Sequence, residues 1–203
     1  MIYARLTPGF FAPLLSAWLS AGAIDRPDQA SLVPQYLQSL QEGEPEAWRA
    51  LFEAEMPSLF RYALGRLGRA EEAEEVVNQT FEEAWKGIPR YEDRGLPLRA
   101  WLFGIARNIV SRHRRRFMSR NAQVSLDAFE VEPTAEAEDP RLVEIAIAMS
   151  QIDQRHAEVL SLRYLHGLSA RETAAVMKIG EEAVKSRQRR ALEALRTRLD
   201  GGS

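Results

Sequence analysis

The stretch RAWLFGIARNIVSRHRRRFMSR, residues 99–120, decides how the rest of the chain is interpreted. It holds seven arginines and neither aspartate nor glutamate. Apolar residues recur every three or four positions in it, which predicts an amphipathic helix. Unbalanced cations on one helix favour a polyanionic partner, because each neutralised phosphate releases counterions. Trp101 and Phe103 could stack on unpaired bases. A solvated basic face above core aromatics is the alternative, and charge alone does not separate the two.

The charge of the whole chain is nearly balanced but strongly segregated. The 203 residues carry a formal charge of −2, with 45% hydrophobic and 28% charged residues. This composition suits one mid-sized domain or two small ones. Residues 70–83 contain six glutamates and no base, whereas residues 99–120 are purely basic. Opposed patches of this kind indicate at least two charged partners, or one partner and a masking segment.

Several classes of site are disfavoured by what the sequence lacks. It has no cysteine, which excludes disulfides, thiolate zinc sites and thiol catalysis and fits a reducing cytoplasm. The histidines are His113, His156 and His166, and none has metal-ligand spacing to a pair of carboxylates. A glycine-rich phosphate loop is also absent. We therefore expect no catalytic residues, no metal and no cofactor.

The first 30 residues contain an apolar run, FFAPLLSAWLSAGAI at residues 10–24. This run could be taken for a signal peptide, but Arg5 is the only base before it and Pro13 interrupts it. It is also too short to span a bilayer as a helix. We expect an N-terminal helical extension docked on the folded body, without membrane insertion. The alternative is that this segment covers a partner protein or a membrane surface.

Helical periodicity continues from residue 32 to residue 120, which predicts one small helical domain over residues 31–120. Gly43-Glu44-Pro45 predicts a turn. Residues 70–85 predict an amphipathic acidic helix, and residues 87–98 predict a loop. Taken alone, the acidic face of residues 70–85 is best interpreted as solvated surface. Residues 121–139 lose periodicity and turn acidic, which predicts a flexible linker between two domains.

Residues 140–199 predict a second all-α domain with a helix-turn-helix. Ser169 and Glu172 form a capping-box pattern that opens a short helix ending near Met177. A turn at residues 178–180 precedes a long helix that starts at Glu181. Its predicted buried stripe is Val184, Ala191, Leu192, Leu195 and Leu199, and its predicted basic exposed face is Lys185, Ser186, Arg189 and Arg190. An ordinary αα-hairpin has the same apolar pattern, but the basic face favours a helix that enters the major groove.

Two sets of motifs resemble one known family. Residues 73–81 (AEEVVNQTF), Ala84-Trp85 and residues 101–108 (WLFGIARN) resemble region two of the extracytoplasmic-function (ECF, group IV) sigma factors of the sigma-70 family. Leu162-Arg-Tyr164, Gly167-Leu-Ser169 and residues 183–187 (AVKSR) resemble region four. The sequence departs from the family pattern at Asn78-Gln79, Arg112, Glu182-Ala183 and Gln188. These departures concern the promoter sequence rather than the class.

The resemblance implies a cytoplasmic, non-enzymatic factor that directs RNA polymerase to promoters. Its implied partners are the clamp and flap of core RNA polymerase, promoter DNA and an anti-sigma factor. The implied polymerase-binding residues are Glu74, Glu75, Asn78, Gln79 and Glu82. The implied minus-ten residues are Lys86, Tyr91, Trp101, Phe103, Arg107, Asn108, Arg112 and Arg115, with Tyr91 supporting a flipped base. Lys185, Ser186, Arg189 and Arg190 would read the minus-thirty-five element. The alternative is a stand-alone helix-turn-helix regulator with an N-terminal effector domain, which leaves the residue 101–108 motif unexplained.

Overall fold

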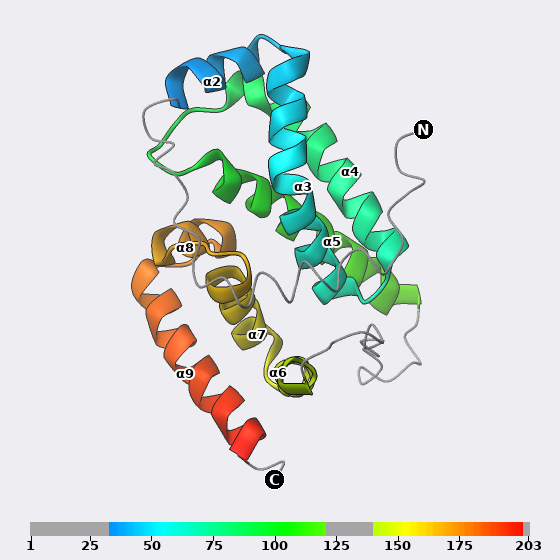
Figure 1. Cartoon of the computed structure of the whole chain (residues 1–203), viewed down its shortest axis with the longest axis vertical. Coiled ribbons are helices and arrows are strands. Elements are labelled where there is room, and N and C mark those ends of the chain that lie inside the picture. The colour runs from blue at the N-terminus through cyan, green and yellow to red at the C-terminus, as the bar shows by residue number, and fades with distance from the viewer. Residues whose placement is uncertain (1–32, 121–139, 201–203) are drawn as a thin grey trace.

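The computed structural model describes residues 33–120 and 140–200, and these residues fold into helices (Figure 1). The predictions for residues 1–30 and for the linker at residues 121–139 lie outside the described residues. The N-terminal bundle consists of α2 (Val33–Gln41), α3 (Pro45–Leu67), α4 (Ala70–Gly87), the short 3₁₀ helix η3 (Ile88–Arg90) and α5 (Leu98–Arg120). The C-terminal bundle consists of α6 (Pro140–Gln151), α7 (Gln154–Leu160), the π-helical turn η4 (Ser161–Leu165), α8 (Ala170–Met177) and α9 (Glu181–Asp200). No helix within these described ranges is long and apolar enough to cross a membrane.

The N-terminal bundle is organised around α3, α4 and α5, as Figure 1 shows. Gly68 ends α3 in the left-handed region, with φ of 75°, and its N–H donates to the carbonyl of Leu64. This cap lets the chain reverse into α4 within two residues. Side chains from all three helices meet in a buried core: Leu59, Ala63, Val76, Ala84, Leu102, Ala106 and Ile109. The predicted amphipathic pattern of α5 is therefore confirmed.

The C-terminal bundle contains the predicted helix-turn-helix. The Ser169 hydroxyl accepts from the N–H of Glu172, whose carboxylate accepts from the N–H of Ser169, so the capping box is confirmed. Lys178 adopts the left-handed conformation that closes α8, and α9 begins at Glu181. The prediction of a buried stripe on α9 is wrong at Leu192 and Leu199, which are 42% and 36% exposed. Leu192 borders an open basic groove instead.

The two bundles pack directly against each other. α8 lies on α5 (Figure 1), and one hydrophobic core joins residues of both bundles. The residues that the C-terminal bundle adds to this shared core are Val159, Leu162, Leu168, Ala174, Val176, Met177 and Val184. A second, smaller cluster holds α7 on α9 through Leu160 and Ala191. Apolar burial of this kind holds the bundles together in the isolated chain.

Candidate nucleic-acid and polymerase interfaces

A cleft opens between the loop after η3 and the first half of α5. Tyr91 and Trp101 line it with their ring centroids 4.9 Å apart and their planes tilted by 50°. The Tyr91 hydroxyl donates to the carbonyl of Leu96 at 3.3 Å, and burial, with a contribution from Asp93, raises the pKa of Tyr91. The Gln41 side chain donates to the carbonyls of Ile88 and Tyr91. The loop is therefore held in shape by α2 and by its own tyrosine.

Trp101 and Phe103 have different environments, although the sequence predicts both as base-stacking residues. Trp101 is half-buried at the cleft and covers Gly87, where a Cβ would come within 3.1 Å of the indole. Phe103 is fully buried, 5.5 Å from Tyr62 and 5.2 Å from His166 between ring centroids. A ring enclosed on all sides cannot stack on a base. The prediction for Phe103 is corrected: in this structure it is a core residue.

The predicted DNA-binding residues on α5 and at the end of α4 differ in their exposure. Asn108 and Arg115 are exposed, and Arg112 is exposed while pairing with Glu83 of α4. Lys86 at the end of α4 is exposed and pairs with Glu82. Arg107 instead points into the contact between the bundles. Of the exposed residues Asn108 lines the cleft, whereas Arg107 is not among the exposed residues.

The α4 surface carries the residues predicted to bind the polymerase. Glu74, Glu75, Asn78 and Glu82 are exposed and Gln79 is half-buried, while Val76, Val77 and Ala84 fix the opposite side of the helix in the core. The Gln79 amide donates to Glu75 at 2.8 Å. Trp85, an apolar residue of this helix, is 52% exposed and lies against Trp48, with 4.8 Å between the ring centroids. Its exposure is a feature that helical periodicity did not reveal.

The first turns of α9 present the predicted recognition residues. Lys185, Arg189 and Arg190 are exposed and Ser186 is half-buried. Lys185 pairs with Glu182 at 2.7 Å and with Glu181 at 3.5 Å. Arg163 and Arg196, which were not predicted as DNA-binding residues, line a groove with Lys185 and Arg189. The Gln188 side chain ties this groove to η4: its amide donates to the Tyr164 hydroxyl at 2.7 Å, and its oxygen accepts from Arg163 at 3.1 Å.

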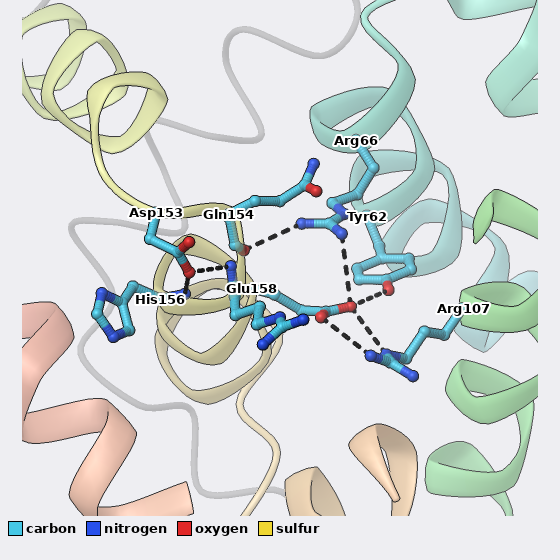
Figure 2. A network of polar contacts seen from close by, with 8 residues as sticks. Tyr62, Arg66, Arg107, Asp153, Gln154, His156 and Glu158 are labelled. Atoms are coloured by element: carbon cyan, nitrogen blue, oxygen red, sulfur yellow. Dashed lines mark hydrogen bonds and ion pairs between the residues drawn. The ribbon is translucent and has the colours of Figure 1, made fainter. Parts of the chain in front are cut away.

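A buried carboxylate joins the two bundles (Figure 2). Glu158 of α7 is 3% exposed and accepts from the Tyr62 hydroxyl at 3.1 Å and from the Arg107 guanidinium at 3.0 and 3.3 Å. A guanidinium nitrogen of Arg66 lies 3.7 Å from the same carboxylate. Burial and the negative charge of Glu158 raise the pKa of Tyr62, so its hydroxyl stays protonated and donates. The sequence pattern singled out neither Glu158 nor its partners, because they are 51 to 96 residues apart in the chain.

Comparisons with known proteins match both bundles to one family. Residues 51–119 match the family model Sigma-70 region 2, and residues 148–197 match Sigma-70, region 4. The ECF RNA polymerase sigma factor SigL of Mycobacterium tuberculosis is 36% identical over 163 residues, which cover 77% of this chain and 90% of SigL. BldN of Streptomyces coelicolor, another ECF RNA polymerase sigma factor, is 32% identical over 167 residues, which cover 79% of this chain and 63% of BldN.

This chain belongs to the ECF RNA polymerase sigma factors. As a sigma factor it directs RNA polymerase to promoters, and because regions 2 and 4 occur in order, the stand-alone regulator is not favoured. Solved sigma factors have the same fold. CnrH, solved with the cytosolic domain of CnrY, superimposes with a TM-score of 0.64 at 26% identity and covers 83% of this chain and 97% of its own. RpoE of Bartonella quintana, solved with the anti-sigma factor NepR, superimposes with a TM-score of 0.62 at 26% identity. The match covers 75% of this chain and 96% of the RpoE chain.

His166 makes the packing of this sigma factor sensitive to pH. The ring is buried between Tyr62 and Phe103, and burial together with the charges of Arg99 and Arg61 lowers the pKa of His166 to about 3. The unfolded chain binds this proton near pH 6.5, so it holds more protons than the folded chain between those values, and stability falls as the pH falls. We expect a loss of about 2 kcal/mol from this group between pH 7 and pH 5.

The measurement is urea unfolding at both pH values, with His166→Phe as the matched variant. Phenylalanine keeps an aromatic ring between Tyr62 and Phe103 but cannot bind a proton. The difference in unfolding free energy between pH 7 and pH 5 should therefore be smaller in the variant. An equal pH dependence in both proteins would contradict this assignment.

Proposed function

We propose that this sigma factor docks on the clamp of core RNA polymerase through the exposed face of α4. The proposed contacts are Glu74, Glu75, Asn78, Gln79 and Glu82. Their support is an exposed polar surface on a helix whose other side is fixed in the core. Trp85 adds an exposed aromatic ring at the end of that surface. Aromatic residues are enriched among interface positions that dominate binding energy, so we include Trp85 in the docking surface.

The cleft beside Tyr91 is the proposed site of minus-ten recognition, and it is the observation that carries the functional assignment. An unpaired base would enter beside Tyr91 and Trp101, where a loop anchored by Gln41 provides aromatic walls. Asn108, which lines the cleft, would contact the strand there, and Lys86, Arg112 and Arg115 would contact it outside the cleft. The ion pairs of Lys86 with Glu82 and of Arg112 with Glu83 are surface pairs, which DNA phosphates can replace at little cost.

The C-terminal bundle is the proposed reader of the minus-thirty-five element. Lys185, Ser186, Arg189 and Arg190 on the first turns of α9 would face the major groove, in the manner of a recognition helix. We assign residues 31–120 and 140–199 to the two functional domains. The C-terminal domain would also contact the polymerase flap. An anti-sigma factor is a proposed partner, because the similar sigma factor RpoE was solved with the anti-sigma factor NepR. The proposed site of action is the cytoplasm.

The experiment that tests this function is transcription in vitro with purified core RNA polymerase. Adding the sigma factor should produce transcripts whose start sites share upstream sequence elements, and sequencing those transcripts would give the promoter. Copurification with core enzyme provides the independent binding test. If the protein binds promoter duplex but never binds core enzyme, the result would favour a stand-alone helix-turn-helix regulator instead.

Charge reversal on α4 tests the docking surface. We expect Glu75→Lys with Glu82→Lys to weaken binding to core RNA polymerase by about tenfold or more, because opposed charges at an interface become like charges. Both side chains are exposed, so the fold should be retained. The control is Glu46→Lys with Glu53→Lys, which makes the same charge change on the exposed side of α3. Affinity measured at physiological salt that is equal in both double variants would exclude α4 as the docking surface.

A further inference from the structure

The contact around Glu158 has its donors on one bundle and its acceptors on the other. Those acceptors are the Glu158 carboxylate and the carbonyl of Gln154, which accepts from Arg66 at 3.4 Å. Tyr62 and Arg66 come from α3 and Arg107 comes from α5, as Figure 2 shows, while Glu158 comes from α7. Arg114 on α5 is a further cation of the same bundle: burial, together with the charge of Arg66, lowers the pKa of Arg114, and the charge of Glu158 opposes this lowering. One carboxylate thus faces an excess of positive charge that belongs to the N-terminal bundle.

The donors have the geometry of an oxyanion site. A guanidinium offers parallel N–H groups that fit a carboxylate and a phosphate equally well, and Arg107 uses two nitrogens on Glu158 in this way. Tyr62 adds a protonated hydroxyl aimed at the same oxygen. Without Glu158, the N-terminal bundle would keep one hydroxyl and two guanidinium groups directed at one point. Such a cluster can bind an oxyanion.

We propose that Tyr62, Arg66 and Arg107 form a binding site for a promoter-DNA phosphate, which Glu158 occupies while the two bundles are packed. This inference rests on the proposed function, in which α5 runs along the minus-ten DNA. Arg107 directly precedes the exposed Asn108 on α5 and points toward the C-terminal bundle, so a strand that contacts Asn108 comes within reach of the long Arg107 side chain once that bundle moves away. Glu158 therefore acts as an internal competitor of the DNA backbone.

The minus-ten cleft points to the same rearrangement. Ala175 and Lys178 of the C-terminal bundle line the cleft together with Tyr91 and Asn108. A base that enters beside Tyr91 must therefore meet α8 unless the C-terminal bundle moves away. That movement also withdraws Glu158, because α7 and α8 belong to the same bundle. Opening of the cleft and release of Arg66 and Arg107 are then one event.

The test uses the full chain, the substitution Glu158→Gln, and a fluorescent 30-base-pair duplex of arbitrary sequence. Phosphate contacts carry no sequence information, so this probe reports the anion site without a known promoter. Glutamine has nearly the same shape as glutamate and can still accept from Tyr62, but it no longer neutralises the arginines. We expect affinity for the duplex to rise about three- to tenfold. The slope of log affinity against log salt concentration should become more negative by about 1–2. Glu53→Gln, which removes one negative charge from an exposed position on α3, should give a smaller gain.

Arg107→Gln in both backgrounds decides whether the gain comes from this site. Because Glu158 neutralises Arg107 in the parent chain, Arg107→Gln should change duplex affinity there by less than about twofold. In the Glu158→Gln chain, Arg107→Gln should remove most of the gain in duplex affinity. It should also reduce the magnitude of the slope of log affinity against log salt concentration by about 1. Equal effects of Arg107→Gln in the two backgrounds would overturn the proposal, as would a gain that persists without Arg107.

Two further measurements keep the result interpretable. If Glu158→Gln loses the cooperative unfolding of the parent chain, Glu158→Asp replaces it. The shorter carboxylate holds the arginines less firmly, so the duplex affinity should again rise, and an unchanged affinity overturns the proposal. Transcription with core RNA polymerase separates the two levels of inference. If the parent holoenzyme is active but the Glu158 and Arg107 variants do not show the expected duplex affinities, the anion site alone is overturned. If the parent chain never assembles with core enzyme, the proposed function is overturned.

Discussion

Replacing Phe103 with alanine is expected to lower the free energy of unfolding by about 3–5 kcal/mol, the range for removing a large aromatic ring from a packed core. The ring is fully buried and contacts Tyr62 and His166, while the Arg99 guanidinium lies 5.3 Å from its centroid. The truncation therefore leaves a cavity at the contact between the bundles, lined by residues of both. Urea unfolding monitored by circular dichroism measures the effect.

Phe117 on the same helix provides the control. It is 56% exposed, so Phe117→Ala should change stability by about 0.5 kcal/mol or less. A Phe103→Ala protein that is as stable as the parent but fails to bind unpaired DNA would contradict the structural role. Such a result would return Phe103 to the base-stacking role that the sequence suggested.

The second large effect separates the two DNA-reading elements. We expect Tyr91→Ala to reduce open-complex formation by about 1–3 kcal/mol, because it removes the aromatic wall for an unpaired base. This loss should persist on promoter templates that are already melted. Arg189→Ala should cost about 1–3 kcal/mol in binding of the upstream duplex, the value for a bidentate contact to guanine. On pre-melted templates Arg189→Ala should have little effect.

Conservative and remote substitutions serve as controls for this pair. Tyr91→Phe keeps the ring and removes only the hydrogen bond to the Leu96 carbonyl, so it should retain most activity. Arg198→Ala removes an exposed cation near the far end of α9 and should leave duplex binding nearly unchanged. Equal failure of Tyr91→Ala and Arg189→Ala on pre-melted DNA would contradict the assigned division of labour.

The local structure of this chain could be predicted well from sequence, because the signals are local. The Ser169 capping box, the turn around Lys178 and the start of α9 at Glu181 each depend on residues within a few positions of one another. The two family regions were also recognisable from short motifs, and the comparisons confirmed them. The assignment of individual DNA-binding and polymerase-binding residues stays a prediction.

The less successful predictions around α5 have one physical cause. Periodicity placed Leu102, Ala106 and Ile109 toward the helix's own bundle, which is correct. Phe103 and Arg107 lie four residues apart on a neighbouring face, and the C-terminal bundle covers that face. Packing between segments far apart in sequence leaves no periodic signal in either segment, so a basic, aromatic face was interpreted as solvent-facing.

The contact between the bundles also differs in chemistry from the core beneath it. Between α3 and α4 the buried side chains are mainly hydrocarbon, such as Leu59, Ala63 and Val76. Around Glu158 and His166 they include groups with an apolar body and a polar end, which water can solvate once they are exposed. Interfaces between domains that part and rejoin have this mixed character, whereas permanent interfaces are more hydrophobic. Reversible separation of the two domains, without local unfolding, is thus compatible with the side chains that line the contact.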